Sequence, residues 1–252
     1  MLPMEPDPDT RERSLRFAAS LVELDTEIDW DLLGQEYCHE GGEGFFPIEQ
    51  REAMREAGLR FASDVANRVE ELGAQSLGRS LYVGAAVAEL APILCESVVL
   101  EREVVAISLA SAETTELNRA LAAVEERVGT LPRIDTRPLA QAEGEFDHVW
   151  MVSVLTDPDA FPALHDHLYE RAGTELATGR GDLERDRGRA IALTRELVQR
   201  LRAPGVLTTS DEEFDFVSAE CAARGWTLAV PERARLSGVV GDPVRVCRVR
   251  GA

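Results

Sequence analysis

Residues 79–94 read RSLYVGAAVAELAPIL, and this stretch decides the fold. The apolar run 81–83 is typical of a buried strand, and Gly84 ends it. From Ala85 to Leu94 apolar residues recur at helical spacing, so the chain is predicted to turn from strand into helix at Gly84. In α/β folds that bind nucleotides, such a turn brings backbone N–H groups against the ligand.

Further strands and helices alternate after this turn. Runs typical of strands follow at 104–109, 133–139, 146–155, 205–209, 226–230 and 243–249. Helical spacing is found at 112–128, 160–172, 190–201 and 212–224, and the polar, glycine-punctuated stretch 173–188 is predicted to be a loop or insertion. Alternation predicts a mostly parallel sheet covered on both faces. The last two strands, which only a loop separates, are expected to pair antiparallel at one edge.

The segment before the first strand is predicted to be helical. Residues 1–10 are expected to be a loose leader, and apolar spacing then predicts one amphipathic helix from Thr10 to about Leu33. A glycine-rich loop covers 37–47. A second helix carries its apolar residues on one face: Ala57, Phe61, Val65, Val69 and Leu72. Residues 1–75 are therefore predicted to form a helical cap on an α/β domain of residues 76–252.

Composition excludes several classes of partner. The net charge of −19, from 46 acidic and 27 basic residues, repels phosphate backbones and anionic lipid headgroups, so neither nucleic acid nor a membrane is expected as a partner. All 27 basic residues are arginine, a lysine-free composition for which GC-rich, bacterial-type coding bias is favoured over avoidance of lysine modification. The acidic, proline-rich start is unlike a signal peptide. A soluble, cytoplasmic protein is expected.

The four cysteines are widely scattered: Cys38, Cys95, Cys221 and Cys247. No CxxC pair occurs among them. This spacing indicates neither a disulfide framework nor a zinc site, and reduced thiols are expected.

Five segments of 76–252 resemble the class I S-adenosylmethionine (SAM) dependent methyltransferases. They are LYVGAAVAELAPIL for the first motif, VVAISLASAET for the second strand, FDHVWMVSVLTD for the fourth, ALTRELVQRLRAPGVLTTSD for the turn into the fifth, and AECAARGWTLAV with PVRVCRVRG for the closing hairpin. The resemblance implies a Rossmann-like class I methyltransferase fold: a seven-stranded, mostly parallel sheet with a C-terminal β-hairpin. It also implies SAM as a possible cofactor.

The same motifs depart from the family at the positions that grip SAM. Tyr82 replaces the first acidic residue, and of three glycines only Gly84 remains, with Ala86 and Ala88 at the other two. A methyl group there pushes a ligand away from the backbone. Ser108 stands where the family grips the ribose hydroxyls with an acid, and it cannot make the same charge-assisted pair. Together these changes predict an eroded SAM site.

Seven residues are candidates for cofactor contact by family position: Tyr82, Gly84, Ala85, Ala86, Ser108, Asp135 and Ser153. Asp135 could equally be a turn aspartate before Pro138. For Ser153, Thr156 and Asp157, at the end of the fourth strand, capping is favoured over a chemical role. Acids that could compensate near the first motif are Glu89 and Glu113.

Other polar clusters are interpreted structurally. Cys38, His39, Glu40 and Glu43 are metal ligands by type, but a flexible glycine loop does not fix their geometry, so no metal is predicted. The aromatic stretch Phe45-Phe46-Pro47 could close over a ligand, although packing is favoured. His165 and His167 are interpreted as solvated helix residues, with a general base as the alternative. A salt-bridged, exposed helix is favoured over an anion site for the arginines at 180, 185, 187, 189, 195, 200 and 202.

Three hypotheses of function follow. The favoured one is a catalytically degenerate methyltransferase-fold protein that acts as a binding module. The others are an active SAM-dependent methyltransferase with a remodelled donor site, and other chemistry on the same scaffold. A protein partner is expected, as a homo-oligomer or with an active homologue, and a small-molecule ligand is possible. No catalytic residue is assigned.

Overall fold

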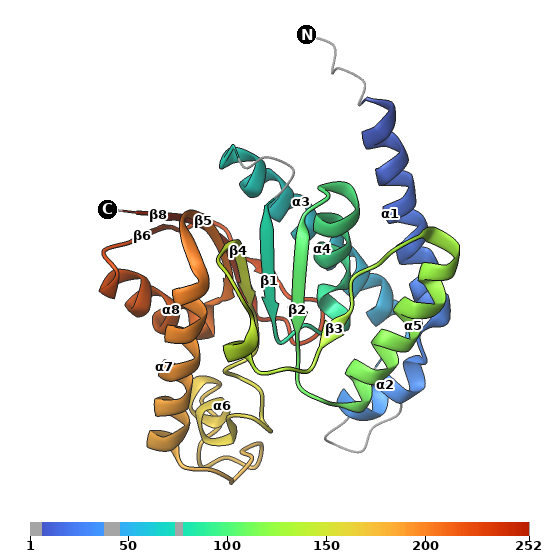
Figure 1. Ribbon diagram of the computed structural model, residues 1–252. Coiled ribbons are helices and arrows are strands. Elements are labelled where there is room, and N and C mark those ends of the chain that lie inside the picture. Colours follow the sequence, from blue (N-terminus) through green and yellow to red (C-terminus); the bar gives the residue numbers. More distant parts are fainter. Residues whose placement is uncertain (1–6, 38–45, 74–77, 252) are drawn as a thin grey trace.

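The computed structural model describes residues 7–37, 46–73 and 78–251, and its strands form one sheet in the order β3-β2-β1-β4-β5-β8-β6 (Figure 1). The strands are β1 Arg79–Val83, β2 Glu103–Ile107, β3 Ile134–Asp135, β4 Phe146–Met151, β5 Leu201–Ser210, β6 Thr227–Ala229, β7 Arg235–Leu236 and β8 Pro243–Arg250.

Strand direction confirms the expected mostly parallel sheet. β3, β2, β1, β4 and β5 are parallel neighbours, whereas β8 runs antiparallel to β5 and to β6. The closing pair therefore forms as predicted. The two-residue strand β7 was not predicted. It pairs antiparallel with the start of β8, off the main path.

Helices cover both faces of the sheet. α1 Pro8–Glu27, α2 Trp30–Tyr37, α3 Ile48–Glu71, α4 Leu90–Leu94 and α5 Ala112–Val128 lie on one side, and α6 Pro162–Leu168, α7 Leu183–Arg200 and α8 Asp211–Ala223 lie on the other (Figure 1). Successive side chains of β1 lie on opposite faces of the sheet, as the two-residue period of a strand requires. Tyr82 joins the core with α1–α5, and Leu81 and Val83 join the core with α6–α8. The division at residue 75 stays a prediction.

The predicted helix from Thr10 to Leu33 is wrong, because the chain breaks between α1 and α2. Ile28 has extended backbone, and the N–H of Asp29 donates to Glu116 Oε1 of α5 at 2.8 Å. The Asp29 carboxylate then accepts the N–H of Leu32, which caps the start of α2. Periodicity continues across the break, so the apolar pattern could not reveal it.

Other elements also differ from their predictions, among them β4, which ends at Met151 instead of residue 155, and α6, which covers Pro162–Leu168 instead of 160–172. α7 begins at Leu183 instead of residue 190, because the Asp182 carboxylate caps it by accepting the N–H of Arg185. β3 is two residues long, and the Asn118 side chain bonds both the N–H and the carbonyl of Ile134. The helix after β1 is interrupted: a 3₁₀ turn Val87–Glu89 precedes α4, and a π turn Cys95–Val99 follows it.

The π turn carries Glu96, a carboxylate with no solvent exposure. It accepts hydrogen bonds from Ser80, Tyr82 and Arg102, and His148 Nδ1 lies 2.7 Å from its Oε1. Burial opposes ionisation, but His148 and Arg102 outweigh it and lower the pKa of Glu96 to about 2. The carboxylate is thus ionised inside the core and joins β1 to β4.

Arg102 extends this network to a second buried acid. Its side chain is 2 % exposed and pairs with Glu96 and with Asp147 at the start of β4. Asp147 also accepts a hydrogen bond from Arg202 of β5 at 2.9 Å. The two buried carboxylates therefore share the guanidinium of Arg102, and Asp147 has that of Arg202 as well.

Arg102→Met is expected to destabilise the protein by about 3 to 5 kcal/mol, because it removes the cation that the two buried carboxylates share and leaves Glu96 with His148 and Asp147 with Arg202 alone. Urea unfolding followed by circular dichroism measures this change. Arg13→Met is the matched control, since it removes the more exposed Arg13–Glu101 pair and should cost about 1 kcal/mol or less. Equal losses in the two variants would contradict the role given to the buried network.

Candidate functional site

The carboxyl ends of the parallel strands bring several candidate residues to one edge of the sheet. Gly84 and Ala85, directly after β1, donate their N–H groups to the carbonyl of Ile107 at 2.9 and 3.0 Å. Ser108, after β2, donates its N–H to the carbonyl of Asp135 at 2.9 Å. Ser153 follows β4, the other neighbour of β1. This edge, from the turn after β1 to the loop after β4, is the candidate site.

The turn after β1 is covered by a side chain from the neighbouring loop. Gly84 has φ +74°, a conformation that favours glycine. A Cβ placed on Gly84 would lie 2.5 Å from Cγ2 of Val154. Val154 therefore packs directly against the Gly84 backbone, and the space that this glycine leaves is taken by the chain itself.

Two glutamate side chains accept the next backbone N–H groups of the turn. Glu89 Oε2 accepts the N–H of Ala86 at 3.0 Å, and Glu113 Oε1 accepts the N–H of Val87 at 3.1 Å. Glu89 lies in the 3₁₀ turn and reaches back to the strand end. These are the two acids that the sequence singled out as possible replacements for the missing family acids, and both bond the turn's own backbone.

Glu89 is buried, with 6 % of its surface exposed. Burial raises its pKa to about 8, and the nearby Glu113 adds to this, whereas the hydrogen bond from Ala86 opposes it. Burial therefore favours the protonated form of the Glu89 carboxyl over the form that an exposed glutamate takes.

Tyr82 and Asp135 point elsewhere. The Tyr82 ring is fully buried and stacks on Trp150 with ring centroids 5.4 Å apart, and its hydroxyl donates to Glu96. Burial raises the pKa of Tyr82 well above its ordinary value. Asp135 is exposed, accepts the N–H of Arg137 and forms an ion pair with the same arginine at 3.0 Å. These contacts match the turn-aspartate interpretation.

A second polar group of residues surrounds Asp242, which precedes β8. Ser153 and Tyr169 both donate their hydroxyls to Asp242 Oδ2, at 2.9 and 2.7 Å. Ser153 has φ +57°, which is uncommon for a residue with a Cβ and is often found at functional sites. Asp242 is 4 % exposed, and its N–H donates to Ser237. We call Ser153, Tyr169 and Asp242 the Asp242 cluster.

Glu213 holds the loop that carries Val154. Its side chain is fully buried, and its Oε1 accepts the N–H of Leu155 at 2.6 Å. Burial raises the pKa of Glu213 to about 8, although hydrogen bonds from the loop lower it. In the sequence SDEE at 210–213, Glu213 stands at the third helical position, where a capping box would return it to its own helix. Sequence reasoning therefore missed both Glu213 and Asp242.

Of the three residues after β4 for which capping was favoured, Asp157 makes such contacts, whereas Ser153 bonds Asp242. The Asp157 carboxylate accepts the N–H groups of Asp159 and Ala160 at 2.8 and 2.7 Å, as the capping interpretation expected. The interpretation of His165 as a solvated residue is wrong. His165 is 8 % exposed, because α6 folds back on this loop and His165 Nδ1 bonds the carbonyl of Thr156 at 2.6 Å. His167 is exposed, as predicted.

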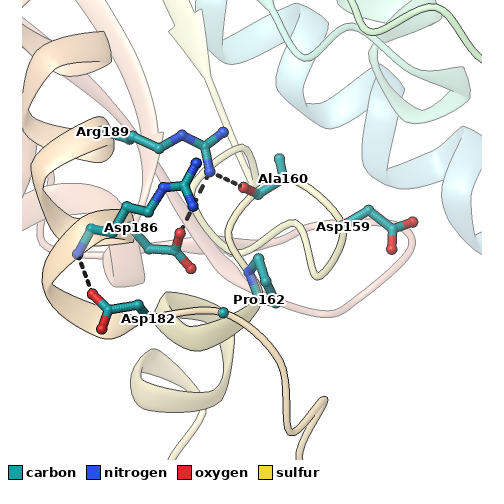
Figure 2. Close-up of a pocket in the computed structure, with 8 residues that line it drawn as sticks. Asp159, Ala160, Pro162, Asp182, Asp186 and Arg189 are labelled. Atoms are coloured by element: carbon teal, nitrogen blue, oxygen red, sulfur yellow. Dashed lines mark hydrogen bonds and ion pairs between the residues drawn. The ribbon is translucent and has the colours of Figure 1, made fainter.

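A cavity with a volume of about 270 Å³ lies between the loop before α6 and the start of α7, as Figure 2 shows. Arg189 donates to the carbonyl of Ala160 at 2.7 Å and lies 3.5 Å from Asp186. Together with the Arg195–Glu220 pair at 3.2 Å, these contacts agree with the salt-bridged helix interpretation. The cavity is lined by Asp159, Ala160, Pro162, Gly181, Asp182, Arg185, Asp186 and Arg189.

A second cavity, of about 50 Å³, lies between α1, α3 and the start of α4. Leu24, Trp30, Met54 and Val87 are among its lining residues. Phe46 packs edge-on against Trp30 in the adjoining core, as its packing interpretation expected. The seven candidate residues all fall within the described part of the chain, and they line neither of these two cavities.

Residues 38–45, with Cys38, His39, Glu40, Glu43 and Phe45, lie outside the described residues. Within residues 7–37, 46–73 and 78–251, no group of three or more histidine, cysteine or acidic side chains is arranged to hold a metal ion. Among the helices of those same ranges, none is both long and apolar enough to span a bilayer.

The chain matches known proteins in its three-dimensional structure and not in its sequence. No protein-family model and no curated protein sequence matches the chain. The chain is similar to the magnesium protoporphyrin IX methyltransferase of Synechocystis with bound SAM: 15% identity, a TM-score of 0.52, and coverage of 92% of this chain and 97% of that chain. The same enzyme with bound S-adenosylhomocysteine gives 12% identity, a TM-score of 0.52, and coverage of 92% and 99%.

A third solved structure, the precorrin-6y C5,15-methyltransferase of Geobacter metallireducens, gives 13% identity, a TM-score of 0.42, and coverage of 74% and 86%. The strand order is that of a doubly wound sheet closed by an antiparallel pair, and the structural match to the Synechocystis enzyme covers nearly all of both chains. The protein therefore has the class I SAM-dependent methyltransferase fold.

Stability is expected to fall as the pH rises from 5 to 8. Glu89 and Glu213 have folded pKa values of about 8 against an ordinary value of 4.5, so the folded chain keeps protons that the unfolded chain has released. The stability that these two protonated carboxyls contribute is complete below their pKa in the unfolded chain. It is lost as the pH rises through their pKa in the folded chain. The loss is on the order of 3 kcal/mol for each group.

Glu89→Gln removes one of these titrations while keeping an acceptor for Ala86, so its unfolding free energy should fall less steeply with pH. Urea unfolding at pH 5, 6, 7 and 8 measures the slope. Glu126→Gln is the control, because Glu126 is exposed on α5. Parallel pH profiles for wild type and Glu89→Gln would contradict the burial assigned to Glu89.

Proposed function

We propose that this protein is a methyltransferase-fold binding module whose SAM grip is eroded. The observation that carries the proposal is that side chains of the protein itself occupy the turn after β1. The N–H groups of Ala86 and Val87 bond Glu89 and Glu113, and Val154 covers Gly84. In nucleotide-binding α/β folds these are the backbone groups that approach a ligand.

The residues at the family positions fit SAM poorly. A ligand in this turn would have to displace two carboxylates from backbone donors and move Val154 off Gly84. Glu213 resists the second movement, because it holds the N–H of Leu155 next to Val154. At the end of β2, Ser108 offers a hydroxyl where a ribose diol would need a carboxylate. Each of these features weakens the donor site, and they act on the same small region.

The binding partner of the proposed module is a protein. With 46 acidic and 27 basic residues, the chain repels nucleic acid and anionic membranes at long range, which favours partners of mixed or positive charge. Cys95, Cys221 and Cys247 are buried free thiols, and burial raises their pKa values. Unreactive thiols of this kind are compatible with a reducing, cytoplasmic location.

The alternative is an active SAM-dependent methyltransferase with a remodelled donor site. The Asp242 cluster favours it, because Ser153, with positive φ, lies beside Asp242 and Tyr169 at the carboxyl end of β4. In the resembling family, substrate and methyl donor would meet over this strand end. A small molecule or a protein could be the acceptor.

Titration calorimetry with SAM and S-adenosylhomocysteine separates the two functions. We expect no heat of binding from the wild-type protein up to millimolar ligand. Binding in the micromolar range, about −8 kcal/mol, would contradict the proposal and favour the enzyme.

The triple variant Ala86→Gly, Ser108→Asp and Val154→Ala is designed to restore the site, and it should gain SAM binding by at least tenfold. It reopens the space over Gly84, frees the turn from one methyl group and supplies a carboxylate for the ribose. A control with Ala122→Gly, Thr115→Asp and Val230→Ala makes the same kinds of change at exposed positions. Equal affinities in the two variants would show that the identified obstructions do not set SAM binding.

A further inference from the structure

The hydroxyl of Ser210, where β5 meets α8, has no hydrogen-bond partner in the part of the chain that the structure describes. Ser210 is the N-cap residue of α8, and a serine in that position usually accepts an N–H of its own helix. Here no such bond forms, although the residue is fully buried. A buried hydroxyl without a partner costs free energy, so this one points to a group that the chain itself does not supply.

Glu212, in the first turn of α8, lies beside this hydroxyl. Burial raises the pKa of the Glu212 carboxyl and Asp242 adds to this, whereas the Ser210 side chain lowers it. The Oε2 atom of Glu212 is also buried and has no hydrogen-bond partner among the described residues. Ser210 and Glu212 therefore bring two unused oxygens to one place.

Asp242 adds a third oxygen from the neighbouring strand. Ser210 pairs with Val244 where β5 and β8 run antiparallel, and Asp242 lies two residues before Val244. The hydroxyls of Ser153 and Tyr169 both donate to Oδ2 of Asp242, and no hydrogen bond from the described residues reaches its Oδ1. We call Ser210, Glu212 and Asp242 the Ser210 site.

The Ser210 site is acidic, and the chain supplies no cation to it. Within residues 7–37, 46–73 and 78–251, no arginine forms an ion pair with Glu212 or Asp242, whereas the neighbouring Asp211 pairs with Arg245 at 2.9 Å. All 27 basic residues of the chain are arginine, so the sequence contains no lysine that could provide an ammonium group. A cation for this site has to come from another molecule.

The unused oxygens match an ammonium group in number. An alkylammonium group donates three hydrogen bonds and accepts none. Oγ of Ser210, Oε2 of Glu212 and Oδ1 of Asp242 are three acceptors, two of which carry charge. A metal ion fits less well, because no group of three or more histidine, cysteine or acidic side chains among the described residues is arranged to hold one.

The dipole of α8 opposes a cation near its first turn, but the carboxylates outweigh it. A helix N-terminus acts as about half of a positive charge. Glu212 and Asp242 each carry a full negative charge when they are ionised, and hydrogen bonds to charged acceptors are stronger than neutral ones. The balance of charge at the Ser210 site therefore favours a cation.

We propose that the Ser210 site binds the ammonium group of an amine, with Ser210, Glu212 and Asp242 each accepting one of its N–H groups. The site lies at the carboxyl end of β5, apart from the turn after β1. The inference deepens the proposed function by naming a chemical group that the module binds, and it rests on that proposal for this role alone. The amine is a small molecule or a lysine of the partner protein.

Two-dimensional NMR of the ¹⁵N-labelled chain, titrated with n-pentylamine, tests the site. We expect saturable shifts of the backbone N–H signals of residues 210–213 and 242. The same titration with n-pentanol, which has the same alkyl chain and no charge, should leave these signals in place. Absence of shifts with the amine, or equal shifts with the alcohol, would overturn the proposal.

Nα-acetyl-lysine amide distinguishes the two sources of the ammonium group. Shifts of the same signals with this compound would show that a lysine within a polypeptide fits the site. Shifts with n-pentylamine alone would assign the site to a small-molecule amine. Either result supports the ammonium site.

Asp242→Asn with Glu212→Gln should weaken n-pentylamine binding by about tenfold or more, because both charges are lost while the amides keep the shape of the side chains. Asp9→Asn with Glu126→Gln is the matched control: it removes the same charge at two exposed positions, and the affinity should stay within about twofold of wild type because distant exposed charges are screened by salt. Equal affinities in the two double variants would contradict the proposal.

Ser210→Ala separates binding from stability. It should weaken n-pentylamine binding by about fivefold, because one acceptor is lost. The free energy of unfolding should stay nearly unchanged, because the hydroxyl makes no hydrogen bond within the described chain. Urea unfolding followed by circular dichroism checks the folding of each variant. Wild-type affinity in Ser210→Ala would overturn the assignment of this hydroxyl to the site.

This inference and the proposed function can fail separately. A chain that binds neither SAM nor n-pentylamine overturns the ammonium site and leaves the eroded donor site in place. A chain that binds both keeps the ammonium site and overturns the eroded donor site. Because SAM carries an ammonium group of its own, its binding is also measured in Ser210→Ala, where binding through the turn after β1 should persist.

Discussion

The buried carboxylate of Glu96 is the interaction on which the centre of the sheet depends. It lies on a π turn and meets groups from β1, β4 and the start of β2 at a point that water does not reach. An ionised group in such a place is tolerated when partners surround it, and His148 and Arg102 supply that requirement. Because the partners come from separate strands, the carboxylate also selects one alignment of those strands.

Carboxylates perform a related task at the opposite ends of the strands. Glu89, Glu113 and Glu213 accept backbone N–H groups of the turn after β1 and of the loop after β4. A buried N–H without an acceptor costs free energy, so these turns are stable without any ligand. The same contacts use the donors that a ligand would need. Under the proposed function, the contacts that stabilise the carboxyl edge therefore also keep a ligand from it.

Much of the fold could be predicted from sequence, because strand and helix periods are local. The alternation from residue 79 onward, the antiparallel closing pair and the helix over 48–71 are all present. Boundaries were less predictable where a distant side chain sets them. The N–H of Asp29, in the break after α1, donates to Glu116 of α5. No pattern within residues 10–33 contains that information. The buried position of His165 likewise depends on how a short helix folds back on a loop.

The class of fold follows from the sequence, because residue type and spacing along the chain carry it, and so does the placement of Tyr82, Ala86 and Ser108 where the resembling family has acids and a glycine. The contacts that the strand ends make instead are visible in the assembled fold alone. Glu89 could have reached toward a ligand or toward its own backbone; in the fold it accepts the N–H of Ala86, while Glu113 accepts that of Val87 and Val154 packs on Gly84. Proximity between side chains from different strands arises only when the sheet is assembled.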